Sequence, residues 1–358
     1  MNYRFLIYIS YSYALPIGNP LETEILNRGY TVKWFSDLDD GKKSISHKTN
    51  TLDTINEVIE FKPDIVLTAT DDVPDFITGL KVQIFHGFLT YKRPEKKTGE
   101  AHFRIRGFFD LYSTQGPSTT KGFLEQKKKY PYFEVMETGW PKVDPLFPLE
   151  NKENTKTIMI ASTFTERLSL AYNDAVFNEI KRLSNSGMFN FIMVLHPKLP
   201  EHIVAKWQSL NGKHFKFHNT TQLIPLFKTS DILFADTTSA IQEYLLQKKP
   251  VVTFNHTYKH DYLLHVNNAN DLEDTFNFAL SYPKDLIEKI NDFVKELHPY
   301  SDGKSSSRLI DATISFLHKD KRHLKSKPLN LIRKFKIRKK LNYFTLKSYN
   351  KQFTISKD

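Results

Sequence analysis

Short apolar segments alternate with helical stretches along most of this 358-residue chain, and no other feature constrains the fold as much. Such alternation is typical of α/β proteins, in which crossover helices cover the faces of a parallel sheet. In the first half we expect helices between several strands, for example at 20–28 and 53–61. The expected strands are 5–10, 31–35, 65–69, 82–86, 111–114 and 135–137.

A second series of strands and helices follows a polar, helix-poor segment at 151–156, which we interpret as an inter-domain linker. We therefore predict two Rossmann-like lobes, 1–150 and 151–318, that face a cleft. The expected strands of the second lobe are 157–161, 191–195, 215–218, 232–235 and 250–254, and its expected helices are 171–184, 223–229, 239–246 and 284–297.

Composition excludes several classes of site. The chain has no cysteine, so it has no disulfide and no thiolate ligand or nucleophile. It lacks a glycine-rich phosphate fingerprint and metal-ligand spacing, so we expect no cofactor and no metal. The N-terminal apolar run is too short for a membrane span and lacks signal-peptide features, so we expect a soluble protein that stays inside the cell. His256, His260 and His265 are too dispersed to assign.

The basic charge is concentrated at the end of the chain. Residues 319–358 carry 14 Lys and Arg against two Asp, a net +12, whereas the whole chain carries +11, so the other 318 residues sum to −1. Apolar side chains interleave with these cations, as in 328–344, and this composition favours an anionic membrane surface. A solvated tail and a nucleic-acid-binding tail are the alternatives, and the near-neutral body argues against an extended nucleic-acid face.

Two histidines follow predicted strands, one in each lobe. His86-Gly87 ends the strand at 82–86, where ligands of α/β sheets bind; the imidazole suits a general base and the glycine allows close approach. His196-Pro197-Lys198 follows the strand at 191–195 and is suited to clamp a phosphate. For each, the alternative is a structural residue at a strand end.

The stretch Asp236-Thr237-Thr238-Ser239 separates a strand from a helix. These residue types are the usual helix caps, but helix-start amides also bind anions. We expect Thr237 to cap while Thr238 and Ser239 bind a phosphate. Two further stretches, 138–144 with Gly139, Pro141 and Asp144, and 302–308, are most simply a turn and a capped helix start.

Taken in order over roughly 80–318, these stretches resemble the CDP-glycerol glycerophosphotransferase family of teichoic-acid and capsule synthesis. The resemblance rests on His86-Gly87, Gly139-Trp140-Pro141-Lys142-Val143-Asp144, His196-Pro197, Asp236-Thr237-Thr238-Ser239, Lys249-Pro250-Val251 and Asp302-Gly303-Lys304-Ser305-Ser306-Ser307-Arg308. The sequence departs from the family pattern at Ser162-Thr163-Phe164-Thr165, where an arginine is missing unless Arg167 substitutes.

The resemblance implies a glycosyltransferase-B-like (GT-B) architecture and a role for each matching residue. His86 would be the base, and His196 and Lys198 would contact the phosphates of the donor. Thr238 and Ser239 would hold its pyrophosphate, with Thr163, Asp236 and Thr237 on the donor side. Gly87, Gly139, Pro141 and Asp144 would support the site.

The implied reaction moves glycerol phosphate, or a related polyol phosphate, from CDP-glycerol to a lipid-linked glycan acceptor, at the cytoplasmic face of the membrane. The alternatives are a GT-B glycosyltransferase, a UDP-N-acetylglucosamine 2-epimerase-like enzyme, and a non-catalytic nucleotide-binding or polysaccharide-export protein. The basic, aromatic C-terminal segment, which epimerases do not need, favours the transferase over the epimerase.

Overall fold

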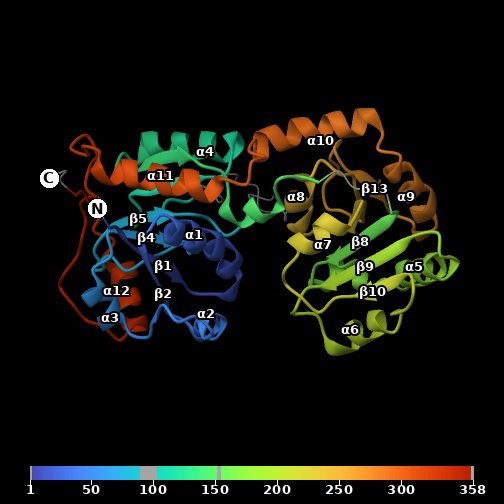
Figure 1. Ribbon diagram of the computed structural model, residues 1–358, viewed down its shortest axis with the longest axis horizontal. Coiled ribbons are helices and arrows are strands. Elements are labelled where there is room, and N and C mark those ends of the chain that lie inside the picture. Colours follow the sequence, from blue (N-terminus) through green and yellow to red (C-terminus); the bar gives the residue numbers. More distant parts are fainter. Residues whose placement is uncertain (1, 89–102, 151–154, 356–358) are drawn as a thin grey trace. The chain divides into compact units, whose positions relative to one another are not determined.

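The computed structural model describes residues 2–88, 103–150 and 155–355 and divides the chain into two compact units. The first comprises Met1–Gly87, Thr98–Pro145 and Leu297–Asp358, and the second Phe88–Lys97 and Leu146–Glu296 (Figure 1). Each unit contains one parallel sheet with helices, which is the predicted α/β class. The boundaries differ from the predicted ones because the chain returns to the first unit at Leu297.

The first unit contains a seven-stranded parallel sheet in the order β3-β2-β1-β4-β5-β6-β7. All six strands predicted for this half are present, and the two-residue β3 is additional. The strands are β1 (Arg4–Ile9), β2 (Thr31–Ser36), β3 (Thr51–Leu52), β4 (Ile65–Thr68), β5 (Leu80–Gln83), β6 (Leu111–Thr114) and β7 (Glu134–Glu137).

Local signals explain where several helices of the first unit begin. A capping box formed by Thr54 and Glu57 starts α3, and Pro117 occupies the first turn of α4, where a missing N–H costs nothing. The first helix starts five residues before the predicted position, with Pro16 in its first turn. The helices are α1 (Leu15–Asn27), α2 (Asp39–Ile45), α3 (Ile55–Phe61), α4 (Pro117–Lys129), α11 (Ser305–His318) and α12 (Leu331–Lys340).

The second unit contains a six-stranded parallel sheet in the order β10-β9-β8-β11-β12-β13. Its strands are β8 (Thr157–Ser162), β9 (Asn190–Leu195), β10 (Phe215–Phe217), β11 (Ile232–Ala235), β12 (Val251–Phe254) and β13 (Leu264–Val266). Only β13 was not predicted. The helices are α5 (Asp174–Ser186), α6 (Glu201–Gln208), α7 (Ile224–Thr229), α8 (Ala240–Leu245), α9 (Leu272–Leu280) and α10 (Lys284–Leu297).

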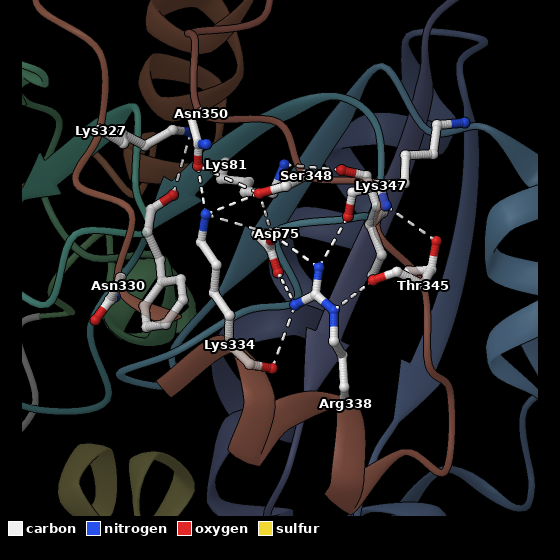
Figure 2. Close-up of polar contacts among 12 residues, drawn as sticks. Asp75, Lys81, Lys327, Asn330, Lys334, Arg338, Thr345, Lys347, Ser348 and Asn350 are labelled. Carbon is white, nitrogen blue, oxygen red and sulfur yellow. Dashed lines mark hydrogen bonds and ion pairs between the residues drawn. The ribbon is translucent and has the colours of Figure 1, made fainter. Parts of the chain in front are cut away.

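The basic C-terminal segment is part of the first unit and not a separate tail. Ile337 of α12 lies in the hydrophobic core of this unit. Arg338 donates to both carboxylate oxygens of Asp75, at 2.7 and 3.2 Å (Figure 2). The ammonium of Lys327 lies 2.6 Å from a carboxylate oxygen of Asp110. Part of the positive charge that the sequence places here therefore anchors the segment to the sheet.

Candidate active site

His86 lies just beyond the carboxyl end of β5 and is exposed. The preceding residue, Phe85, has a φ of 52°, a left-handed conformation that a bulky residue rarely adopts. The Phe85 ring packs against Phe123 with ring centroids 5.0 Å apart, while the chain turns so that His86 faces solvent. A β-carbon added at Gly87 would meet no atom within 4 Å. The geometry leaves the imidazole accessible to a substrate hydroxyl.

Two tyrosines that follow β1 accompany His86. The ring of Tyr13 lies 5.4 Å from the His86 ring and is itself stacked on Tyr11 at 5.4 Å. Partial burial, followed by nearby carboxylates, raises the pKa of Tyr13 to about 12, so its hydroxyl stays protonated at neutral pH. Tyr11 and Tyr13 are among the exposed large side chains. Sequence reasoning missed them, although their place after the first strand was a usable signal.

The loop after β7 is held by contacts with residues 298–305 of the same unit. Gly139 has a φ of 82°, and a β-carbon there would come within 2.5 Å of the Ser305 hydroxyl. The backbone N–H of Trp140 donates to Nε2 of His298 at 3.0 Å, so the other ring nitrogen donates to the carbonyl of Tyr300 at 2.9 Å. Burial lowers the pKa of His298 to about 4, which keeps its ring neutral.

Asp144 caps α11 from a separate element, the short 3-10 helix Pro141–Leu146. Its carboxylate accepts from the N–H groups of Ser305 and Ser306, at 2.8 and 2.7 Å, and from the Ser306 hydroxyl at 2.7 Å. We expected a hydroxyl at the start of α11 to cap this helix. The cap is instead the carboxylate of Asp144, which is distant in the sequence. Arg308 ties the same region together by pairing with Asp302 and donating to the carbonyl of Thr138.

In the second unit, Asp236 follows β11 and is fully buried. Its carboxylate accepts from the Ser162 hydroxyl at 2.6 Å and from the N–H groups of Thr163 and Leu170, each at 3.0 Å. Because β8 and β11 are neighbours, Asp236 fixes the loop that leaves β8. Thr163 is held through its backbone N–H, which donates to Asp236.

His196 follows β9, the other neighbour of β8, and is half-buried. Its Nδ1 accepts from the backbone N–H of Lys198 at 3.1 Å, which leaves Nε2 as the N–H of the neutral ring. The Phe164 ring lies 4.5 Å from the imidazole, and the Lys198 ammonium lies 5.3 Å from the centre of that ring. His196 and Lys198 thus lie together at the carboxyl edge, an arrangement that suits an anion.

The prediction that Thr237 caps α8 is wrong. Its hydroxyl is bonded to the hydroxyl of Thr257 at 2.8 Å and accepts from the Thr257 N–H at 3.2 Å. The residue before α8 is Ser239, whose side chain makes no capping bond, and Thr238 accepts a long bond of 3.4 Å from Ala240. Thr238 and Ser239 are half-buried, whereas Thr237 is buried. Thr237 therefore joins two loops of the second unit.

The three histidines left unassigned in the sequence gather beside this threonine pair. His256 precedes Thr257, and its ring lies 5.8 Å from His260 and 6.0 Å from His265. Burial lowers the pKa of both His256 and His260, so they are neutral at pH 7. Among the residues with described positions, no group of three or more His, Cys, Asp or Glu side chains is placed to hold a metal ion.

Residues 82–315 match the family of CDP-Glycerol:Poly(glycerophosphate) glycerophosphotransferases. The chain belongs to this family. The matched span contains His86, His196 and all the ordered stretches on which the resemblance was based. No curated protein matches the sequence.

Solved structures of two kinds share the fold of this family member. UDP-GlcNAc 2-epimerase from Neisseria meningitidis aligns with a TM-score of 0.62 at 16% identity, over 87% of this chain and 100% of that one. A variant of the wall teichoic acid polymerase TagF aligns with a TM-score of 0.60 at 12% identity, over 88% and 89%. Together with the two parallel sheets, these neighbours confirm the predicted GT-B-like α/β architecture.

Proposed function

We propose that this family member transfers a glycerol-phosphate unit from CDP-glycerol to a hydroxyl of a lipid-linked glycan during cell-surface polymer synthesis. One observation carries the proposal. Within the residues that match the family, the two histidines at strand ends, His86 and His196, are accessible to ligands. The carboxylates Asp144 and Asp236 of the same region are buried and hold loops and helix starts in place. A structure of TagF, a fold neighbour, was obtained with a CDPG soak.

The reaction follows from the chemistry of these groups. His86 accepts the proton of the acceptor hydroxyl as its oxygen attacks the phosphorus that carries the glycerol. A phosphorus–oxygen bond forms to the acceptor, the phosphoanhydride bond breaks, and CMP leaves with the bonding electron pair. His196, Lys198 and the Thr238 and Ser239 hydroxyls stabilise the charge on the pyrophosphate, so the protein contributes mainly positioning and electrostatics.

A panel of nucleotide donors tests this proposal. The chain is incubated with CDP-glycerol, CMP or a UDP-sugar, and thermal stability and release of CMP, UMP or UDP are measured. We expect CDP-glycerol to raise the melting temperature, and CMP to be released when an acceptor is present. Protection by UDP-sugars with none from CDP-glycerol would overturn the proposal in favour of a glycosyltransferase or an epimerase-like enzyme.

We also propose that the protein works on an anionic membrane surface, which fits a lipid-linked acceptor. Several large apolar side chains of the C-terminal segment are 58–103% exposed, and exposed lysines such as Lys336 and Lys339 lie among them. Apolar side chains mixed with cations bind the interface of anionic bilayers. No helix within 2–88, 103–150 or 155–355 has the length and apolarity to cross a bilayer. The apolar set is Leu329, Leu331, Ile332, Phe335, Phe344 and Leu346.

Vesicle sedimentation tests the membrane proposal. We expect binding to vesicles of phosphatidylcholine mixed with phosphatidylglycerol, and loss of most of it in the double variant Ile332→Ser with Phe335→Ser. Phe278→Ser removes another exposed apolar side chain, from the second unit, and serves as the control. Equal binding by both variants would show that this surface is not the contact.

A further inference from the structure

Four basic side chains of the first unit are almost completely buried together, with exposures between 1% and 9%. Only two carboxylates, Asp75 and Asp110, pair with them in the described structure. The group therefore carries two more positive than negative charges when every amine is protonated. Its cations are Lys81, Lys327, Lys334 and Arg338 (Figure 2).

Both carboxylates already have several donors. Asp75 accepts from Arg338 and from the Ser348 hydroxyl and lies 3.4 Å from the Lys334 ammonium. Asp110 accepts from the Lys327 ammonium at 2.6 Å and from the backbone N–H of Lys81 at 2.8 Å. Neither carboxylate contacts the ammonium of Lys81.

The Lys81 ammonium donates only to backbone carbonyls, those of Ile77 at 2.8 Å and Gly79 at 3.3 Å. A buried cation without an anionic partner is costly. Burial, reinforced by the nearby Lys327, lowers the pKa of Lys81 to about 7. An anion beside this amine would relieve that cost.

A cavity of about 740 Å³ lies beside the two lysines and has room for such an anion. Lys81 and Lys327 each make two hydrogen bonds through their ammonium groups, and an ammonium has three N–H donors. Lys351 adds a third, exposed ammonium to the lining. Residues with hydroxyl or amide side chains also line it: Ser326, Ser348, Tyr349, Asn350, Gln352 and Thr354.

We infer that this cavity binds a phosphate group, and that the headgroup of an anionic membrane lipid supplies it. Three ammonium groups and several hydroxyls match the acceptor oxygens of a phosphate. The lipid is favoured because Leu329, one of the exposed apolar residues of the proposed membrane surface, also lines the cavity. The lipid assignment rests on the proposed membrane contact and not on the identity of the donor.

The site is distinct from the candidate active site. Gly79 and Lys81 lie at the amino end of β5, whereas His86 follows its carboxyl end. The parallel strands of the sheet separate these two edges. The cavity is therefore a second binding site, one that would hold the first unit on the membrane while leaving His86 unobstructed.

Two variants and one control test the inference. Lys81→Met removes the buried amine at similar length, and Lys351→Gln removes the exposed one without disturbing the fold. Lys43→Gln makes the same charge change at an exposed site that does not line the cavity. Binding is measured to vesicles of phosphatidylcholine alone or mixed with phosphatidylglycerol, and inorganic phosphate is titrated with thermal stability as the readout.

We expect both cavity variants to bind the phosphatidylglycerol vesicles several-fold to about tenfold more weakly, the scale of one cation near such a surface. The control should bind normally, and inorganic phosphate should stabilise the natural protein but neither cavity variant. If phosphate stabilised only the natural protein but the cavity variants still bound vesicles normally, the cavity would bind phosphate. The inference that a lipid headgroup supplies this phosphate would then be overturned. Equal behaviour of all the proteins in both assays would overturn the site. CMP release from CDP-glycerol is scored separately, so failure of the transferase proposal is distinguishable.

Discussion

The carboxyl edges of the two sheets carry their family residues in different ways. In the first unit, the edge presents His86 and two stacked tyrosines to solvent. In the second unit, the buried carboxylate of Asp236 lies at this edge and holds the loop after β8. His196 and Lys198 of the same edge lie nearer the surface. The residues that match the family therefore include side chains that are accessible to a ligand and side chains that hold nearby loops in place.

Of the effects that we expect from this contrast, the largest is a loss of catalytic rate when the exposed His86 is replaced. His86→Ala should lower the rate of CMP release by roughly 10²–10⁴-fold, the usual contribution of a general base, because no other group then accepts the acceptor proton. The unfolding temperature should not change, since the side chain is exposed. Steady-state kinetics and thermal unfolding measure the two quantities.

The matched control is His47→Ala, which removes an exposed histidine of the same unit. Its activity should equal that of the natural protein. If His86→Ala released CMP at the rate of the natural protein, His86 would not be the catalytic base. The carboxyl edge of the first sheet would then have a structural role only.

The buried carboxylate of the second edge should instead affect stability. Asp236→Asn turns an amide N–H₂ group toward the donors that the carboxylate now accepts, so we expect a loss of about 2–4 kcal/mol in the free energy of unfolding. Denaturant titration measures it. The control, Asp292→Asn, changes an exposed aspartate of the same unit and should cost little. A stable but inactive Asp236→Asn protein would mean that the carboxylate acts on the ligand.

Much of the fold was predictable, because central strands of a parallel sheet are continuous apolar segments. All eleven predicted strands are present. The two missed strands, β3 and β13, lie at sheet edges and have two and three residues, too few for a recognisable pattern. The helix α12 was not predicted because its many Lys and Arg residues indicated a surface segment at a membrane or in solvent, whereas three of them pair with distant carboxylates.

The positions of the strand-end histidines were also predictable, because the carboxyl ends of parallel strands share an edge. Their surroundings were not. The bond between Trp140 and His298 joins residues 158 positions apart, and the Thr237–Thr257 pair joins two loops. Such partners depend on the packing of separate elements, so local preferences led to the incorrect assignment of Thr237 as a cap.

A histidine with the opposite environment to His86 provides a test by pH. The pKa of His298 lies at about 4, below its ordinary value of 6.5, because burial disfavours the charged ring. The unfolded chain therefore binds a proton at this residue before the folded one does, so its contribution to stability is complete above pH 6.5 and is lost as the pH falls toward 4. The loss should reach at most about 3 kcal/mol.

Denaturant titrations at several pH values measure this loss. The variant His298→Asn should be less stable at neutral pH and should lack this component of the acid dependence, while His47→Ala should retain it. An identical acid dependence in His298→Asn and the natural protein would contradict the assignment of His298 as a buried, neutral acceptor.

The smallest expected effect concerns the hydroxyls before α8. It distinguishes Thr238, which we expect to bind the donor, from its neighbour Thr237, which joins two loops. The double variant Thr238→Val with Ser239→Ala should raise the KM for CDP-glycerol roughly thirtyfold with kcat little changed, since it removes two hydrogen bonds worth about 1 kcal/mol each. Thr237→Val should leave KM unchanged and lower the melting temperature, because that buried hydroxyl is bonded to Thr257. Initial rates over a range of donor concentrations, with thermal unfolding of the same preparations, distinguish the two results. An unchanged KM in the double variant would show that the donor is held by other groups of the second edge, His196 and Lys198 first among them.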